Sequence, residues 1–303
     1  MAPIGAGGGT LDVCQPMNAD NLRLPGAGPL AAQHSRSRQA FPTWPEWRSF
    51  LLQALLVAGI ELSDDFYRGV ISPRPVAFPQ ANAVHVMDFE RSHGFWVEPA
   101  IQRYFEHVHH FLGLTITWRE VVPLVNTIYG VAHGLVTLVV ALWLFWRRRT
   151  LFPFVRNVFI ITTALSVVTY NLFPLAPPRL ATGLTYNGRP FHFIDTVFVG
   201  GGVNLGFDRY AAMPSLHLAW ALIVGVTVFW TARPLAVRLL GIAHPVLMCL
   251  AVVVTANHYI ADCLGALAIV LVAYLVAWLG SKSNLPWIAG VDSDDPGAVT
   301  QRA

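Results

Sequence analysis

Residues 121–146 contain no aspartate, glutamate, lysine or arginine, and most of their side chains are apolar. A helix needs about 20 such residues to cross roughly 30 Å of membrane hydrocarbon. Comparable apolar stretches occur at about 152–175, 213–232, 238–256 and 259–280. The sequence therefore predicts five membrane-spanning helices.

A sixth stretch, at about 48–70, is apolar at its start but has Glu61, Asp64 and Asp65 near its end. We include it, and the resulting fold class is an all-α integral membrane protein with a six-helix transmembrane bundle. The composition agrees, because only 12% of the residues are charged, against about 25% in soluble domains.

The two ends of the chain lack apolar periodicity, and residues 1–43 are rich in Gly, Pro, Ala and Ser. We predict flexible tails at 1–43 and 281–303, on either side of a membrane domain at 44–280.

The start also lacks the basic and apolar regions of a cleaved signal. Cys14, Cys249 and Cys263 show no CxxC spacing, so neither a zinc site nor a disulfide framework is expected.

Arginines near short connections predict the orientation in the membrane. The connection after 121–146 is flanked by Arg147, Arg148, Arg149 and Arg156, and the connection after 213–232 by Arg233 and Arg238. Short loops rich in arginine face the cytoplasm. We therefore expect a multi-pass protein of the cell membrane with both termini inside and the long loop at 176–212 outside. The net charge of +3 is too small to indicate a nucleic-acid partner.

The segment at 85–114 has an approximately helical apolar stripe, opposed by charged residues that include Glu98 and Arg103. This pattern is typical of an amphipathic helix in the outer membrane interface. A surface helix packed on the bundle explains it equally well.

Polar residues at three span ends are candidate site residues, because ionisable groups are costly within a membrane. In the first group, at 171–181, Pro177 and Pro178 end the helix and present Arg179 at the interface. A guanidinium group can bind two phosphate oxygens at once. On this group alone, an arginine that only reaches the lipid headgroups is an equally good interpretation.

The second group, at 213–217, places Pro214 and Ser215 at the start of an apolar helix. Unpaired N–H groups and the helix dipole favour an anion at such a position. Ser215 is therefore a candidate phosphate-binding residue, with a simple N-cap role as its alternative. His217 follows among apolar residues, where a purely structural histidine is the alternative.

In the third group, at 255–270, His258 and Asp262 are four residues apart, which places them on one face of a helix. The carboxylate can accept a hydrogen bond from one imidazole nitrogen and leave the other as a nucleophile or base. This spacing is common by chance, but a carboxylate at the start of a membrane helix needs a partner.

Together these groups suit covalent phosphoryl transfer. His258 would attack phosphorus, His217 would protonate the leaving oxygen, and Asp262 would stabilise the charged His258. Arg179 and the N–H groups of a helix start would hold the remaining phosphate oxygens. We expect neither a metal ion nor another cofactor.

The stretches "YNLFPLAPPR", "AAMPSLHLAW" and "ANHYIADCLGA" resemble, in this order, the three motifs of the type 2 phosphatidic acid phosphatase superfamily. The stretches "DFERSHGFWVEPAIQRYF" and "NTIYGVAHG" resemble its inositol-phosphorylceramide-synthase-like branch and related actinobacterial membrane proteins. The resemblance covers about residues 45–280. It implies a six-helix phosphatase or phosphotransferase domain whose active site faces away from the cytoplasm.

The resemblance also implies a role for each motif residue. His258 corresponds to the nucleophile, Asp262 to its orienting acid and His217 to the general acid. Phosphate binding falls to Arg179 and, less directly, to Ser215.

Two cations of the phosphatase branch are missing, because Leu172 and Val252 stand in their places. The second motif also reads Ser-Leu-His instead of Ser-Gly-His. These differences favour the transferase-like branch over simple phosphatidate hydrolysis. Arg189, Arg209 and His133 are each either a replacement cation or a structural residue.

We therefore expect a lipid-linked phosphate as the substrate and either water or an alcohol such as inositol as the acceptor. One alternative is a non-catalytic or transport-type protein that binds anions, but the repeated broken helices of such transporters are not visible. A degenerate structural member is a second alternative, and the intact His217, His258 and Asp262 argue against it.

Overall fold

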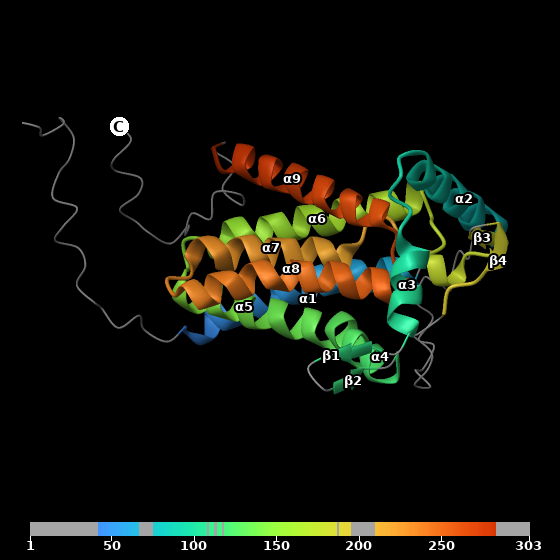
Figure 1. Cartoon of the computed structure of the whole chain (residues 1–303). Coiled ribbons are helices and arrows are strands. Elements are labelled where there is room, and N and C mark those ends of the chain that lie inside the picture. Colours follow the sequence, from blue (N-terminus) through green and yellow to red (C-terminus); the bar gives the residue numbers. More distant parts are fainter. Residues whose placement is uncertain are drawn as a thin grey trace, which may run out of the picture. The chain divides into compact units, whose positions relative to one another are not determined.

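The computed structural model describes residues 42–66, 75–107, 109–111, 114–116, 118–186, 188–194 and 210–282. These residues are mostly helical, with two short antiparallel hairpins (Figure 1), which confirms the predicted fold class. Apart from 42–43 and 281–282, the predicted tails lie outside the described residues, as do Cys14 and Arg209.

The long helices follow the predicted spans closely. The helices are α1 (Trp44–Phe66), α2 (Ala77–Ser92), α3 (Glu98–Glu106), α4 (Trp118–Thr127), α5 (His133–Arg147), α6 (Phe152–Leu172), α7 (Leu216–Thr231), α8 (Leu235–Val254) and α9 (Ile260–Lys282). A π-helical turn, η3 (Ile128–Ala132), joins α4 to α5, and a 3-10 turn, η4 (Pro178–Leu180), follows α6. Strand β1 (His109–Phe111) pairs with β2 (Leu114–Ile116), and β3 (Leu184–Tyr186) pairs with β4 (Arg189–Phe191).

Within the described residues, four helical segments are long and apolar enough to cross a membrane, namely 121–147, α6, α8 and α9. Helix α7 is equally apolar but has only 16 residues, which corresponds to about 24 Å. Helix α1 has 23 residues and is not one of the four. Each of the six predicted spans thus matches one helical segment: α1, 121–147, α6, α7, α8 and α9. Four of these segments are both long enough and apolar enough to cross a membrane.

Helix α7 lies at the centre of the bundle, since it contacts α5, α6, α8 and α9. It runs beside α8 (Figure 1), and the two backbones approach closely where Gly225 faces Gly241. A Cβ atom at Gly225 would lie 2.6 Å from the carbonyl oxygen of Gly241. Small residues at such crossings allow the close packing that holds membrane helices together.

Large apolar side chains face outward around the bundle. On α8 and α9, for example, Leu240 is 69% exposed and Leu271 is 61% exposed. A soluble protein rarely leaves such extended apolar faces uncovered, whereas lipid chains cover them in a membrane. The outer faces of these helices therefore agree with membrane association.

The arginine-rich turns meet at one end of the bundle. Arg148 donates a hydrogen bond of 3.0 Å from Nη2 to the carbonyl of Thr231, the last residue of α7. Arg149 forms an ion pair with Glu46 near the start of α1. The second polar motif begins α7 at Ser215, so it lies about 24 Å from these arginines along the helix.

The predicted amphipathic segment at 85–114 covers the second half of α2 and all of α3, which are joined by a turn in which Gly94 has a φ of +76°. Helix α3 packs on the bundle, where Ile101 and Phe105 contact buried residues of α8. Glu98, placed by the pattern on the polar face, is fully buried. That part of the prediction is wrong, because the Glu98 carboxyl group accepts a backbone N–H from a distant segment.

Replacing Gly225 with alanine is expected to destabilise the bundle by about 1–3 kcal/mol, because the new Cβ meets backbone that cannot move aside. Thermal unfolding in detergent, followed by circular dichroism, measures the loss. Gly134→Ala in α5 is the control, since a Cβ there has no heavy atom within 4 Å and alanine favours a helix. Equal unfolding temperatures for the two variants would contradict the close contact of α7 with α8.

Candidate active site

The three predicted groups come together where α6 and α8 end and where α7 and α9 begin. The backbone N–H of Arg179 donates to the carbonyl of Ala256, just after α8, at 2.9 Å. The backbone N–H of Ser215 donates to the carbonyl of Asp262, in the first turn of α9, at 3.2 Å. Main-chain hydrogen bonds therefore set the spacing of the three groups.

His258 has a defined tautomer. Its Nδ1 atom lies 2.7 Å from the carbonyl oxygen of Ala212 and 3.3 Å from Oδ2 of Asp262. Because a carbonyl oxygen can only accept a hydrogen bond, Nδ1 carries the proton. The Nε2 atom of the neutral ring is then unprotonated, as a nucleophile requires. The shorter of the two contacts goes to the backbone and not, as predicted, to Asp262.

Asp262 is fully buried in the first turn of α9. Its Oδ2 atom also accepts the backbone N–H of Tyr259, at 2.9 Å. His258 itself lies in the turn between Val254, where α8 ends, and Ile260, where α9 begins. The pair therefore forms across a helix start, and the prediction that both residues share one helical face is wrong for His258.

Arg179 is held beside His258 by Asn257. The Nε atom of Arg179 donates to Oδ1 of Asn257 at 2.8 Å, and Nδ2 of Asn257 donates to Oγ1 of Thr255 at 2.7 Å. Asn257 is only 5% exposed. This chain of contacts fixes the Arg179 guanidinium group against Asn257, the residue that precedes His258. Sequence reasoning missed Asn257, although it directly precedes His258 in the third motif.

The turn between α8 and α9 depends on Ala256, whose φ of +53° is left-handed. Such a conformation costs a residue other than glycine about 1–3 kcal/mol. It ends α8 sharply, and the carbonyl of Val252 accepts the N–H groups of both Asn257 and His258, at 3.0 and 3.2 Å. The turn thereby directs the carbonyl of Ala256 toward Arg179.

Ser215 is the N-cap of α7 and is fully buried. Its Oγ atom accepts the backbone N–H of Leu218 at 3.4 Å, so the alternative capping role is present. The preceding residue is fixed as well, because the hydroxyl of Tyr170 donates to the carbonyl of Pro214 at 2.9 Å. The start of α7 is therefore rigidly placed beside the His258 turn.

His217 lies between aromatic rings from another part of the chain. Its ring stacks on Tyr129 with centroids 4.1 Å apart, and the ring of His133 lies 4.7 Å away. Tyr129 belongs to η3, a π-helical turn of the kind that often occurs at functional sites. His217 and His258 are also close enough to interact electrostatically. Sequence reasoning did not single out Tyr129.

The two residues that stand in place of the missing cations, Leu172 and Val252, lie in different surroundings. Leu172 is 76% exposed on the outside of α6, whereas Val252 is fully buried in α8. Of the proposed replacements, Arg189 is exposed in the β3–β4 hairpin, and His133 contacts His217. Of these two candidates, His133 is the one that lies beside a predicted site residue, and whether it replaces a cation or is structural stays open.

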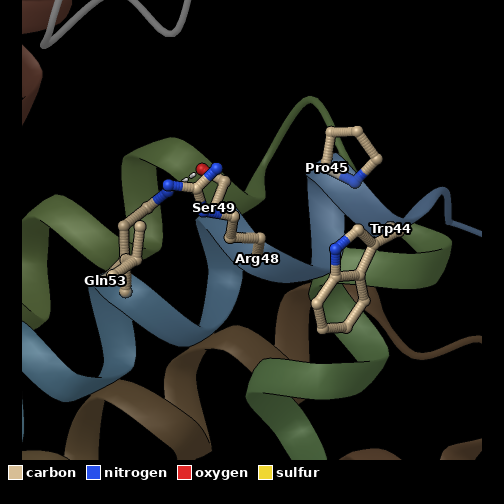
Figure 2. A pocket seen from close by; sticks show the side chains of 6 residues that line it. Trp44, Pro45, Arg48, Ser49 and Gln53 are labelled. Atoms are coloured by element: carbon tan, nitrogen blue, oxygen red, sulfur yellow. Dashed lines mark hydrogen bonds between the residues drawn. The ribbon is translucent and has the colours of Figure 1, made fainter.

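A pocket of about 540 Å³ lies elsewhere, along the first turns of α1 (Figure 2). It is lined by Trp44, Pro45, Arg48, Ser49, Leu52 and Gln53. None of the motif residues lines it, so it does not compete with the histidine cluster as a candidate active site. The part of the chain that the structure describes contains no group of three or more His, Cys, Asp or Glu side chains arranged to hold a metal.

Comparison with protein families gives a match over residues 84–276 to the model described as the PAP2 superfamily. The matched region extends from α2 to α9 and includes all three polar groups. No curated protein and no solved structure gives a significant match.

Tyr170→Phe is expected to lower the stability by about 1 kcal/mol, because it leaves the buried carbonyl of Pro214 without its donor. The unfolding temperature in detergent measures this loss. Tyr186→Phe is the matched control, since its hydroxyl makes no hydrogen bond among the described residues and its ring contacts remain. If both variants unfold at the same temperature as the unmodified protein, the hydrogen bond from Tyr170 to Pro214 does not contribute to stability.

Proposed function

We propose, because this chain belongs to the PAP2 superfamily, that it is a membrane-embedded phosphotransferase or phosphatase for a lipid-linked phosphate. Membership supports the general class of enzyme. The finer proposal is that the reaction proceeds through a phosphohistidine at His258. It rests chiefly on one observation, the hydrogen bond from Nδ1 to Ala212, which leaves Nε2 as the available nucleophile.

In the first step, Nε2 of His258 attacks phosphorus as the bond from phosphorus to the leaving oxygen breaks. His217, in its protonated imidazolium form, gives a proton to that oxygen and becomes neutral, so the alcohol leaves as a neutral molecule. The phosphorylated imidazole is then a cation that retains its proton on Nδ1. The carboxyl group of Asp262, 3.3 Å from Nδ1, stabilises this cation.

In the second step, an acceptor hydroxyl attacks the phosphohistidine, and the bond from phosphorus to Nε2 breaks. His217 takes the proton of the hydroxyl, which restores both histidines to their starting states. Water as the acceptor gives free phosphate, and an alcohol gives a new phosphodiester or phosphomonoester. The resemblance of the sequence motifs to an inositol phosphotransferase branch is the reason for proposing an alcohol such as inositol.

Arg179 and the start of α7 are proposed to bind the phosphate. Asn257, the residue before His258, holds the Arg179 guanidinium, and the guanidinium would pair with the oxygens that gain charge in the transition state. The first N–H groups of α7 supply donors and a favourable dipole. Ser215 would act mainly through its cap, which places these groups.

The proposed orientation puts the site on the outer side of the cell membrane. The arginine-rich turns gather at the far end of α7 from Ser215, and such turns face the cytoplasm. A lipid phosphate of the outer leaflet would then reach the site without crossing the bilayer.

Incubating the protein with lipid phosphates that carry a labelled phosphoryl group is expected to label the protein, and His258→Ala should abolish both labelling and turnover. His192→Ala, in an exposed loop, should retain both. The labelled protein is then chased in buffer with and without inositol. Labelled free phosphate indicates hydrolysis, and a labelled inositol product indicates transfer. Binding of phosphate without label or product would favour an anion-binding protein and overturn the proposal.

Asp262→Asn is expected to lower kcat by about 10- to 100-fold, since the cation on His258 loses its counter-charge. The loss should be smaller than the roughly 10⁴-fold seen where a carboxylate alone sets the histidine tautomer, because Ala212 still holds Nδ1. Steady-state kinetics with one lipid phosphate measure this effect. A loss as complete as that of His258→Ala would show that the Ala212 contact cannot set the tautomer.

A further inference from the structure

Two buried glutamates from outside the membrane-spanning helices contact the start of α9. Oε1 of Glu98, in α3, accepts the backbone N–H of Ile260 at 2.7 Å. Oε1 of Glu90, in α2, accepts the backbone N–H of Ala261 at 2.7 Å. Both side chains are fully buried. The first N–H groups of a helix have no partner within the helix, and here two distant carboxyl groups satisfy them.

These contacts continue directly from the candidate nucleophile. Asp262 accepts the N–H of Tyr259, so three carboxyl groups serve the three consecutive N–H groups that follow His258. The contacts reach across 162 and 171 positions of the chain. Such a set of donors and acceptors leaves the turn little freedom to move relative to α2 and α3.

No basic side chain among the described residues pairs with either glutamate, and Oε2 of each carboxyl group is buried without another group that donates to it. The two carboxyl groups interact with each other through a side-chain hydrogen bond. The other ionisable groups around the pair, Asp262, Tyr259 and Cys263, are also acids. Burial, and then the charge of Glu98, raises the pKa of Glu90 to about 9, and burial also raises the pKa of Glu98. At neutral pH the pair therefore retains a proton.

We propose that Glu90 and Glu98 are positioning residues for the reaction, and that they hold the turn carrying His258 and Asp262 against Arg179. This inference rests on the proposed function of His258. The two carboxyl groups would act through the backbone N–H groups of Ile260 and Ala261, and not by binding the phosphate. Their position is maintained while the pair retains its proton.

The direction of the pH dependence follows from the raised pKa. A carboxyl group whose pKa rises on folding contributes stability that is lost as the pH rises through the folded pKa. Above pH about 9, where Glu90 ionises, two adjacent negative charges would repel each other and Asp262. The turn should then loosen, and kcat should fall while KM changes little.

Glu90→Gln and Glu98→Gln test this proposal, because glutamine retains the Oε1 acceptor but cannot ionise. We expect kcat near pH 7 within about threefold of the unmodified protein, and a smaller loss of kcat above pH about 9. Alanine at either position should lower kcat by about 10- to 100-fold with little change in KM. Asp88→Asn, an exposed change on α2, should alter neither kcat near pH 7 nor the loss of kcat above pH about 9. Glutamine variants with an unchanged alkaline loss, or alanine variants with normal kcat, would overturn the proposal.

Amide hydrogen exchange at residues 259–262 provides a readout that does not depend on turnover. Exchange should become faster in the alanine variants, at pH 7, and stay slow in the glutamine variants. Unchanged exchange in the alanine variants refutes the positioning role whatever the activity. Failure of the unmodified protein to form a phosphoenzyme instead refutes the function of His258 and leaves the exchange result standing.

Discussion

The hydrogen bond from Nδ1 of His258 to the carbonyl of Ala212 is the contact on which the candidate site depends. It connects the turn before α9 to the segment before α7. It also fixes which imidazole nitrogen is protonated, without relying on the charge of Asp262. Backbone bonds from Ser215 to Asp262 and from Arg179 to Ala256 complete the frame. The reactive groups are thus arranged mainly by main-chain contacts, which persist when side chains change.

Two layers of structure support this frame. The apolar helices of the bundle fix the distances among the three motifs, since α7 packs against α8 and α9 and α6 packs against α9. The second layer, α2 and α3, lies where α9 begins (Figure 1). It satisfies helix-end N–H groups that would otherwise be buried without acceptors, at a cost of about 1–3 kcal/mol each. Helices α2 and α3 therefore support the candidate site as much as the bundle helices do.

The spans and the three motifs could be predicted from the sequence, because apolar periodicity and local helix-start signals depend on neighbouring residues. The segments that carry Arg179, Ser215 and His258 are accordingly joined by hydrogen bonds, while the roles of these residues stay predictions. The partners of these residues could not be predicted. Glu98 fits the polar stripe of an amphipathic helix, and only the fold reveals that it binds a backbone N–H 162 positions away.

The shortness of α7 has a consequence for how a lipid would meet this protein. Its 16 residues cover about 24 Å, roughly 6 Å less than average membrane hydrocarbon. Helix α7 is enclosed by α5, α6, α8 and α9, so these neighbouring helices, and not lipid, cover the difference in length. A lipid headgroup would then have to reach inward, between the ends of the surrounding helices, to approach the buried Ser215.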